Sequence, residues 1–190
     1  MRTTLPLPRR LGLAGGAAAL LAVVAVALPS VPAQANVVCD AAALMPGAIT
    51  AWPYVGTSGD DVIVGSSGAD SIDGLGGDDL ICGMGGSDDI EAGTGTDEVY
   101  GGLGDDWVAG EGWNSPVTGA GDVLHGGPGQ DSLYGNLGAD DLYGDGDDDY
   151  LYGGDAGDEL FGNDGDDLLD GQSGGDACTG GNGNNTYMSC

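Results

Sequence analysis

Apolar and polar positions repeat with a period of nine along most of this chain. From residue 56 onward one apolar side chain recurs at every ninth position, between two mostly polar neighbours. This pattern predicts a strand of three residues whose middle side chain faces a core. The six residues before each strand are rich in glycine and aspartate, which predicts a tight turn. The chain is therefore expected to alternate turns with very short strands.

Aligned on itself, the chain gives the register G-x-x-G-x-D-x-U-x, where U is apolar. Six uninterrupted copies fill residues 56–109 and seven more fill residues 126–188. Position 1 is glycine in twelve of these thirteen copies, and position 4 is glycine in eleven. The residues at position 8, expected to face inward, are Ile63, Ile72, Ile81, Ile90, Val99, Val108, Leu133, Leu142, Leu151, Leu160, Leu169, Cys178 and Tyr187.

Position 6 holds the candidate metal ligands. It is aspartate in every copy but the last, which has Asn185. With Asp122 from the stretch between the two blocks, these candidates are Asp61, Asp70, Asp79, Asp88, Asp97, Asp106, Asp122, Asp131, Asp140, Asp149, Asp158, Asp167 and Asp176. Glycine at positions 1 and 4 permits left-handed backbone angles and leaves the turn carbonyls unobstructed. Calcium takes six to eight oxygen ligands, and one such turn supplies about half of them, so two turns are expected to share an ion.

Two nonapeptides make one coil of 18 residues with a strand on each side. Stacked coils place each copy beside the next but one, pair their strands in parallel and align the inward residues in a thin core. These motifs resemble the calcium-binding nonapeptides of the repeats-in-toxin, or haemolysin-type, family. The resemblance covers residues 56–188. It implies an all-β, right-handed parallel β-roll with two nonapeptides per coil, and several Ca²⁺ ions held between successive turns by position-6 aspartates and turn carbonyls.

The first 35 residues have the composition of a secretory signal peptide. Arg2, Arg9 and Arg10 precede an uncharged apolar run, and small residues at Ala33 and Ala35 mark a cleavage site. We therefore expect a signal peptide at 1–35, an N-terminal capping segment at 36–55, the repeats at 56–188 and a C-terminal tail at 189–190 that contains Cys190. The mature chain is expected to be secreted and extracellular.

The strongly negative charge of the chain excludes some classes of binding partner. The chain has 31 acidic residues and three basic ones, and all three basic residues lie within the expected signal peptide. Binding to nucleic acid or to an anionic membrane surface depends on lysine and arginine, so neither partner is expected. Calcium ions are the expected counterpart. Because the core is thin and the carboxylates repel one another, the chain is expected to fold only when calcium binds.

The stretch 110–125 departs from the register. It can be read as a worn copy with Ser115 at position 6 and Val117 at position 8, or as a seven-residue loop-out over 110–116. Ser115 has no carboxylate, which predicts the loss of one metal site. A tolerated surface irregularity is favoured over a binding loop built on Trp113.

Four cysteines remain after the expected cleavage, in a compartment where thiols oxidise. A solenoid needs its two open ends covered. Of the three possible connectivities, pairing Cys39 with Cys82 and Cys178 with Cys190 ties one terminal segment to each end. The spacing of the cysteines does not match a zinc site.

Aromatic residues recur at position 9, where Tyr134 is expected to stack toward Tyr152 and Tyr143 toward Phe161. The 36–55 segment is too short for a catalytic domain, and His125 has no nucleophile motif around it, so no enzyme activity is expected. The favoured function is a structural or binding module that holds calcium. The alternatives are an adhesin or carbohydrate-binding surface protein stabilised by calcium, and a non-catalytic partner of a secreted enzyme.

Overall fold

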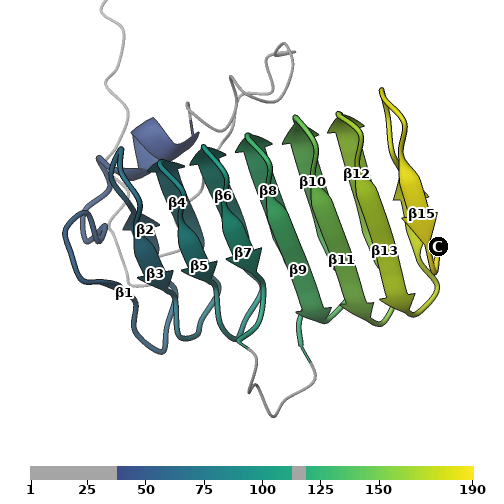
Figure 1. Cartoon of the computed structure of the whole chain (residues 1–190). Helices are drawn as coiled ribbons and strands as arrows, with labels where there is room; N and C mark the ends of the chain where they lie inside the picture. The colour runs from purple at the N-terminus through teal and green to yellow at the C-terminus, as the bar shows by residue number, and fades with distance from the viewer. Residues whose placement is uncertain (1–37, 113–118) are drawn as a thin grey trace, which may run out of the picture.

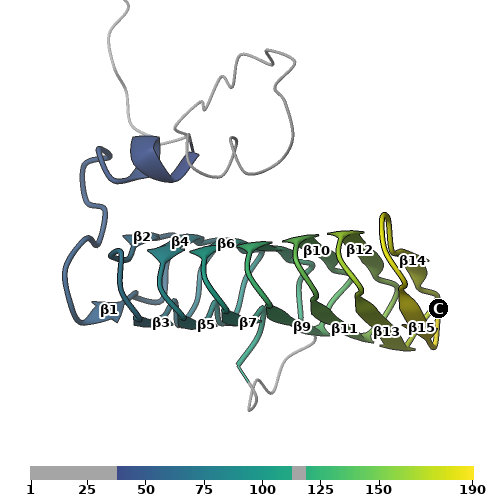
Figure 2. The same cartoon turned by 45° about the horizontal axis from the view of Figure 1, so that its top comes forward.

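Two parallel β-sheets lie face to face in this protein. The computed structural model describes residues 38–112 and 119–190, and the chain alternates between the sheets as it advances along the solenoid (Figures 1 and 2). The eight-stranded sheet contains, in spatial order, β1 (Tyr54–Val55), β3 (Ser71–Asp73), β5 (Asp89–Glu91), β7 (Trp107–Ala109), β9 (Ser132–Leu137), β11 (Tyr150–Asp155), β13 (Leu168–Ser173) and β15 (Thr186–Met188).

The second sheet has seven strands, all parallel to their neighbours. It contains, in the reverse direction of the chain, β14 (Ala177–Thr179), β12 (Glu159–Asp164), β10 (Asp141–Gly146), β8 (Val123–Pro128), β6 (Glu98–Leu103), β4 (Leu80–Gly85) and β2 (Val62–Val64). The parallel β-roll that the sequence predicts is confirmed. No helix within the described ranges is long and apolar enough to cross a membrane. The expected signal peptide lies outside these ranges.

Strand pairing follows the predicted step of two nonapeptides. Leu133 of β9 pairs with Leu151 of β11, and Leu142 of β10 pairs with Leu160 of β12. Several strands are six residues long rather than the predicted three, as in β10 and β12. The reason is that the first half of each turn also pairs with the next coil, as Asp145 does with Asn163.

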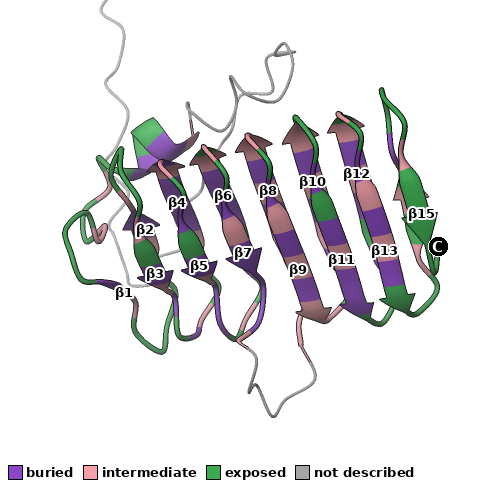
Figure 3. Ribbon diagram, in the orientation of Figure 1, coloured by how far each residue is buried: buried purple, intermediate pink, exposed green. Residues whose placement is uncertain are grey.

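The core consists of two facing rows of position-8 side chains, one from each sheet, together with Tyr54 and Ala92. From Ile63 to Leu169 these side chains are buried, with relative exposures of 0 to 2%, and they appear as the buried bands of Figure 3. Burying a side chain of this size stabilises a fold by about 1.5 to 3 kcal/mol. The prediction was wrong for the last coil, where Tyr187 is 51% exposed. Tyr187 lies on β15, the edge strand of the eight-stranded sheet, and so has a neighbouring strand on one side only.

The segment before the repeats has two roles in the structure. Ile49 pairs with Ile63 at the edge of the seven-stranded sheet, and β1 forms the edge of the eight-stranded sheet. A helical turn at 38–42 packs elsewhere, because its Cys39 and Ala42 form a second buried cluster with Val64, Cys82 and Tyr100 at position 9. The leader therefore contacts an outer face as well as extending the open end.

Both predicted disulfides are present. Cys39 is bonded to Cys82, and Cys178 is bonded to Cys190. The first bond joins the leader to β4, and the second joins the last residue to β14 in the final coil. Each end of the stack therefore carries one covalent link.

The position-9 aromatic residues stack as predicted, and the stack is longer than predicted. Ring centroids of Tyr134 and Tyr152 are 4.9 Å apart, as are those of Tyr143 and Phe161. His125 continues the second stack, with its ring 4.6 Å from Tyr143 and 4.9 Å from Tyr100. Its Nδ1 lies 3.2 Å from Oδ2 of Asp145. His125 thus has a place in an outer ladder on the seven-stranded sheet.

Candidate metal sites

The position-6 aspartates form two hydrogen-bonded columns, one along each row of turns. In each link the backbone N–H of one aspartate donates to Oδ1 of the aspartate in the next coil. Asp131 donates to Asp149 over 2.8 Å, and Asp149 donates to Asp167 over 3.0 Å. One column contains Asp61, Asp79, Asp97, Asp122, Asp140, Asp158 and Asp176. The other contains Asp70, Asp88, Asp106, Asp131, Asp149, Asp167 and finally Asn185.

The second carboxylate oxygen has no hydrogen-bond partner in most of these aspartates, although Oδ2 of Asp61 and Oδ2 of Asp70 accept the backbone N–H groups of Thr57 and Ser66. Within the described residues, Oδ2 is buried and unpaired in Asp79, Asp88, Asp97, Asp106, Asp122, Asp131, Asp140, Asp149, Asp158 and Asp167. An unpaired buried carboxylate oxygen is costly unless a cation or proton neutralises it. The remaining candidates Asp61, Asp70 and Asp176 are only half-buried, because they lie in the terminal coils.

Burial raises the pKa of these carboxyl groups. For Asp149 burial raises the pKa from 3.8 to about 9; the hydrogen bond from Asp131 lowers it, and the charges of Asp131 and Asp167 raise it further. The pKa is also raised to about 9 in Asp122, about 8 in Asp131, about 7 in Asp106 and Asp140, and about 6 in Asp79 and Asp97. In the metal-free fold Asp122, Asp131 and Asp149 therefore hold protons at neutral pH, whereas Asp79 and Asp97 are mostly ionised.

Position-1 glycines leave the unpaired oxygens facing a carbonyl of the next coil. A β-carbon on Gly135 would meet both Oδ2 of Asp140 and the carbonyl oxygen of Gly153. A β-carbon on Gly101 would meet Oδ2 of Asp106 at 2.6 Å and the carbonyl oxygen of the next coil at 2.8 Å. A carboxylate oxygen from one coil and a carbonyl oxygen from the next therefore converge where a side chain would otherwise be.

Left-handed backbone angles occur at positions 2 and 4, not at positions 1 and 4 as expected. At position 4 the prediction holds in ten of the thirteen copies, and even the exceptions Asp147 and Ala156 have φ values of 74° and 94°. At position 2 the same region is occupied by non-glycine residues such as Leu75 and Asn163. Position 1 is glycine for a different reason, which is the close approach of oxygens described above.

The irregular stretch keeps one complete turn with seven extra residues inside it. Asp97 donates to Oδ1 of Asp122, 25 residues ahead, whereas regular links span 18. A β-carbon on Gly110 would meet Oδ2 of Asp122 and the carbonyl oxygen of Gly135, as at other position-1 glycines.

This register identifies the residues of the interrupted turn. Gly110 and Glu111 occupy positions 1 and 2, and residues 119–122 occupy positions 3 to 6, so the additional residues are 112–118. The worn-copy interpretation is wrong, because it would require an extra strand between β7 and β8, which already alternate between the two sheets. The loop-out interpretation is correct in length, but the additional residues are 112–118 and not 110–116. Ser115, Val117 and Trp113 lie outside the described residues. The turn retains its aspartate, Asp122, so the predicted loss of a site is not supported.

One acid in this turn went unnoticed in the sequence. Glu111 is 1% exposed, and its Oε2 accepts a hydrogen bond from the backbone N–H of Leu137 over 3.0 Å. Its Oε1 is buried and unpaired. In the sequence, Glu111 differs from the other acids only in its position within the interrupted turn. That position became clear only from the register of the strands.

The donor set suits a hard cation. Every candidate ligand atom described above is oxygen, which favours calcium or magnesium over softer metals. Within the described ranges no group of three or more His, Cys, Asp or Glu side chains is arranged to hold a metal ion on its own. Carbonyl oxygens of the turns must therefore complete each coordination shell.

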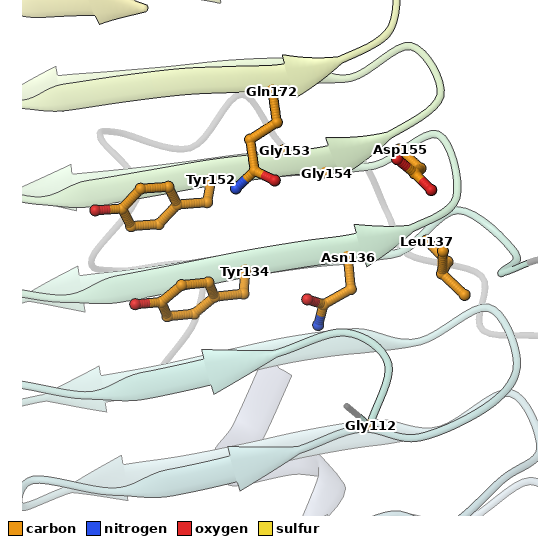
Figure 4. A pocket seen from close by; sticks show the side chains of 9 residues that line it. All are labelled: Gly112, Tyr134, Asn136, Leu137, Tyr152, Gly153, Gly154, Asp155 and Gln172. Carbon is orange, nitrogen blue, oxygen red and sulfur yellow. The ribbon is translucent and has the colours of Figure 1, made fainter. Parts of the chain in front are cut away.

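A shallow hollow lies beside the aromatic residues of the eight-stranded sheet (Figure 4). Its volume is about 320 Å³, and its floor includes Gly153 and Gly154. Asn136 and Gln172 flank Gly154 in the strand register. Tyr152 borders the hollow and stacks on its neighbour at an interplanar angle of 10°. The stacked rings cover one another's faces.

Comparison with known families gives one match. The model of the RTX calcium-binding nonapeptide repeat matches four times, at residues 55–90, 83–112, 117–151 and 152–187. These matches span more than half of the chain and both rows of turns. The search of curated proteins gives no match.

Proposed function

This chain belongs to the RTX calcium-binding nonapeptide repeat family, and we propose that it is a secreted structural or binding module that folds when calcium fills the turns of its roll. The observation that carries the proposal is the row of buried aspartates whose Oδ2 atoms have no hydrogen-bond partner. Calcium supplies the positive charge that neutralises these unpaired oxygens. The chain's part is to hold the oxygens in place from two adjacent coils.

We assign the metal ligands to the position-6 aspartates, to Asp122 and to turn carbonyls. In the middle of the roll each ion lies between two coils. Each aspartate therefore binds the ion held between its own coil and an adjacent coil. The terminal aspartates Asp61, Asp70 and Asp176 have a neighbouring coil on fewer sides. They are expected to bind more weakly than the buried ones.

Calcium binding is linked to folding because the metal-free roll has a thin core and many acids. Each nonapeptide contributes one inward side chain, and the whole chain carries 31 acidic residues. Mutual repulsion of carboxylates opposes the compact state. Metal that binds only the folded chain adds its binding free energy to the stability of the fold.

An extracellular setting is consistent with this chemistry. RTX repeats are typical of secreted proteins, and two disulfides persist only where thiols oxidise. We propose that residues 1–35 direct export and that residues 36–55 cap the roll. Extracellular modules bind calcium with dissociation constants of about 10⁻⁴ to 10⁻³ M. Sites of that strength stay empty in the cytosol and fill outside the cell.

The test is a calcium titration of residues 36–190 followed by far-ultraviolet circular dichroism. We expect a cooperative change from coil to β signal as calcium reaches about millimolar concentrations, and a return to coil with chelator. Magnesium is the control ion and is expected to have little effect, because it demands a smaller octahedral shell. A full β signal that persists in excess chelator at pH 8 contradicts calcium-dependent folding, and a chain that binds no calcium contradicts the function itself.

Carbohydrate binding is a second candidate, favoured by the hollow beside Tyr134 and Tyr152. The amide groups of Asn136 and Gln172 border this hollow and could bond to sugar hydroxyls. Because stacking hides the faces of the two rings, these polar groups must carry the recognition. A glycan array with wild-type protein and Gln172→Ala tests it. Binding that the substitution abolishes supports this function, and an absence of binding to any glycan opposes it.

A further inference from the structure

The interrupted turn contains a glutamate, which no regular turn has. Glu111 occupies position 2, where other copies have residues such as Gly102, Gly127 or Asn136 and one copy has Asp145. Glutamate is uncommon in this chain, and the other three glutamates, Glu91, Glu98 and Glu159, lie on strands. Glu111 is the one that lies in a turn.

The two oxygens of Glu111 have different surroundings. Oε2 accepts the backbone N–H of Leu137. In a regular turn the position-3 N–H donates to the position-2 carbonyl of the preceding coil, as Asn182 does to Asn163. Here the carboxylate replaces that carbonyl, while the carbonyl oxygen of Glu111 accepts the side-chain amide of Asn136 over 2.8 Å.

The other oxygen, Oε1, is buried and has no hydrogen-bond partner. A β-carbon on Gly119 would meet both Oε1 of Glu111 and the carbonyl oxygen of Leu137. Oε1 therefore lies between position 3 of its own turn and position 3 of the next coil. This is the space between two stacked turns, and not the outer surface.

Two further unpaired oxygens belong to the same pair of coils. They are Oδ2 of Asp122 in the interrupted turn and Oδ2 of Asp140 in the next coil. Among charged neighbours, Glu111 makes the largest contribution to raising the pKa of each of these aspartates. Glu111 is thus a buried acid close enough to act on both Asp122 and Asp140, and no basic residue of the described ranges neutralises it.

We propose that Glu111 is a calcium ligand, and that it contributes Oε1 to an ion held between the interrupted turn and the coil of Asp140. The inference rests on the proposed calcium binding of the roll and adds a ligand outside the nonapeptide pattern. The seven extra residues separate positions 2 and 3 of this turn. A carboxylate that bonds to the next coil and reaches the ion restores the backbone contact at that break and adds a negative charge there.

The decisive variant is Glu111→Gln. Glutamine keeps an acceptor for the N–H of Leu137 and nearly the same shape, but it removes the charge. If Glu111 binds calcium, the variant binds one ion fewer per chain, or one site weakens about 10- to 100-fold. If Glu111 only accepts the N–H of Leu137, the variant retains the full number of ions. Bound calcium is counted by elemental analysis after equilibrium dialysis.

The matched control is Glu159→Gln, which makes the same chemical change on an exposed residue of β12. It is expected to bind as many ions as the wild type. An equal loss in both variants means a general charge effect and overturns the assignment. Unchanged stoichiometry and affinity in Glu111→Gln overturns it too. A wild-type chain that binds no calcium overturns the proposed function instead, so the two failures are distinguishable.

A folding defect is separated by the calcium dependence of the circular dichroism signal. If Glu111→Gln is unfolded at a calcium concentration that folds the wild type, the titration is extended to higher calcium. Recovery of the β signal there supports a weakened site. A chain that stays unfolded at every concentration has lost a structural contact, and that result counts against Glu111 as a ligand.

Discussion

The backbone N–H of Asp131 donates to Oδ1 of Asp149 over 2.8 Å, while Oδ2 of Asp149 is buried without a partner. Each oxygen of this carboxylate therefore has a separate task. Oδ1 fixes the side chain against the preceding coil, and Oδ2 remains for a cation. The same division recurs along both columns of aspartates, so the ligand geometry is set by the backbone of the neighbouring coil.

Asp149→Asn separates these two tasks. The amide oxygen still accepts the N–H of Asp131, but the negative charge is lost. We expect calcium affinity at that coil to fall by about tenfold or more, because ligand charge sets calcium affinity. Asp40→Asn in the exposed leader is the control and should leave affinity unchanged. Calcium titration by calorimetry measures both. Equal losses in the two variants would mean that the acids act as a diffuse cloud of charge.

Acid should stabilise the metal-free roll. The buried aspartates have folded-state pKa values raised from 3.8 to between about 6 and about 9, above those of the unfolded chain. Their contribution to stability is therefore fully present below about pH 4 and is lost as pH rises through the folded-state values. In chelator we expect more β signal at pH 5 than at pH 8. Calcium affinity should change in the opposite direction, because calcium competes with protons.

The control for this pH dependence is the double variant Asp131→Asn and Asp149→Asn. It removes two of the titrating groups, so its metal-free β signal should vary less with pH. A metal-free wild-type chain whose β signal is constant from pH 5 to pH 8 would contradict the prediction.

The two disulfides should differ in their effect on stability. The bond between Cys39 and Cys82 closes a separation of 43 residues, and the bond between Cys178 and Cys190 closes 12. The chain-entropy model gives about 4 and about 3 kcal/mol for loops of these lengths. Replacing each pair by serine should lower the free energy of unfolding in calcium in that order, measured by urea titration. Non-reducing peptide maps provide the control for connectivity, and free thiols or a Cys39 to Cys190 link would refute it.

Ala156→Gly should stabilise the roll. Ala156 occupies position 4 with φ of 94°, a region that side chains with a β-carbon rarely adopt. Relief of this strain outweighs the added entropy of glycine in the unfolded chain, and we expect a net gain of about 1 kcal/mol. Ala139→Gly, at an exposed position 5, should instead cost up to about 1 kcal/mol. A loss of stability in both variants would show that the backbone at residue 156 is unstrained.

The nonapeptide period was sufficient to predict the coil, the core residues and the parallel pairing. These features depend only on which side chains face the core, and the position-8 side chains from Ile63 to Leu169 face it in every copy. The disulfides followed as well, because only one connectivity links both ends. The leader helix on the outer face could not be predicted, since its contact with Val64 and Tyr100 depends on how a short segment packs in three dimensions.

The candidate metal site could be predicted in part. Position-6 aspartates were recognisable because twelve of the thirteen copies repeat them. The true role of position 1 was not, because it depends on an oxygen of the next coil approaching Gly135 or Gly101. Glu111 also escaped notice, since it belongs to a turn that was interrupted. Its environment became clear only when the strands fixed which residues of 110–125 face Asp140.

The alternation between sheets gives this protein an unusual rule for changes of length. The seven additional residues at 112–118 leave every later strand in its register, because they are inserted within a turn and not within a strand. Loss of 18 residues would remove one coil and keep Tyr143 and Phe161 on their present sheet. Loss of nine would move every later strand to the opposite sheet, and with it the whole aromatic stack. Lengths of such chains are therefore expected to change during evolution by even numbers of nonapeptides or by loops of any size.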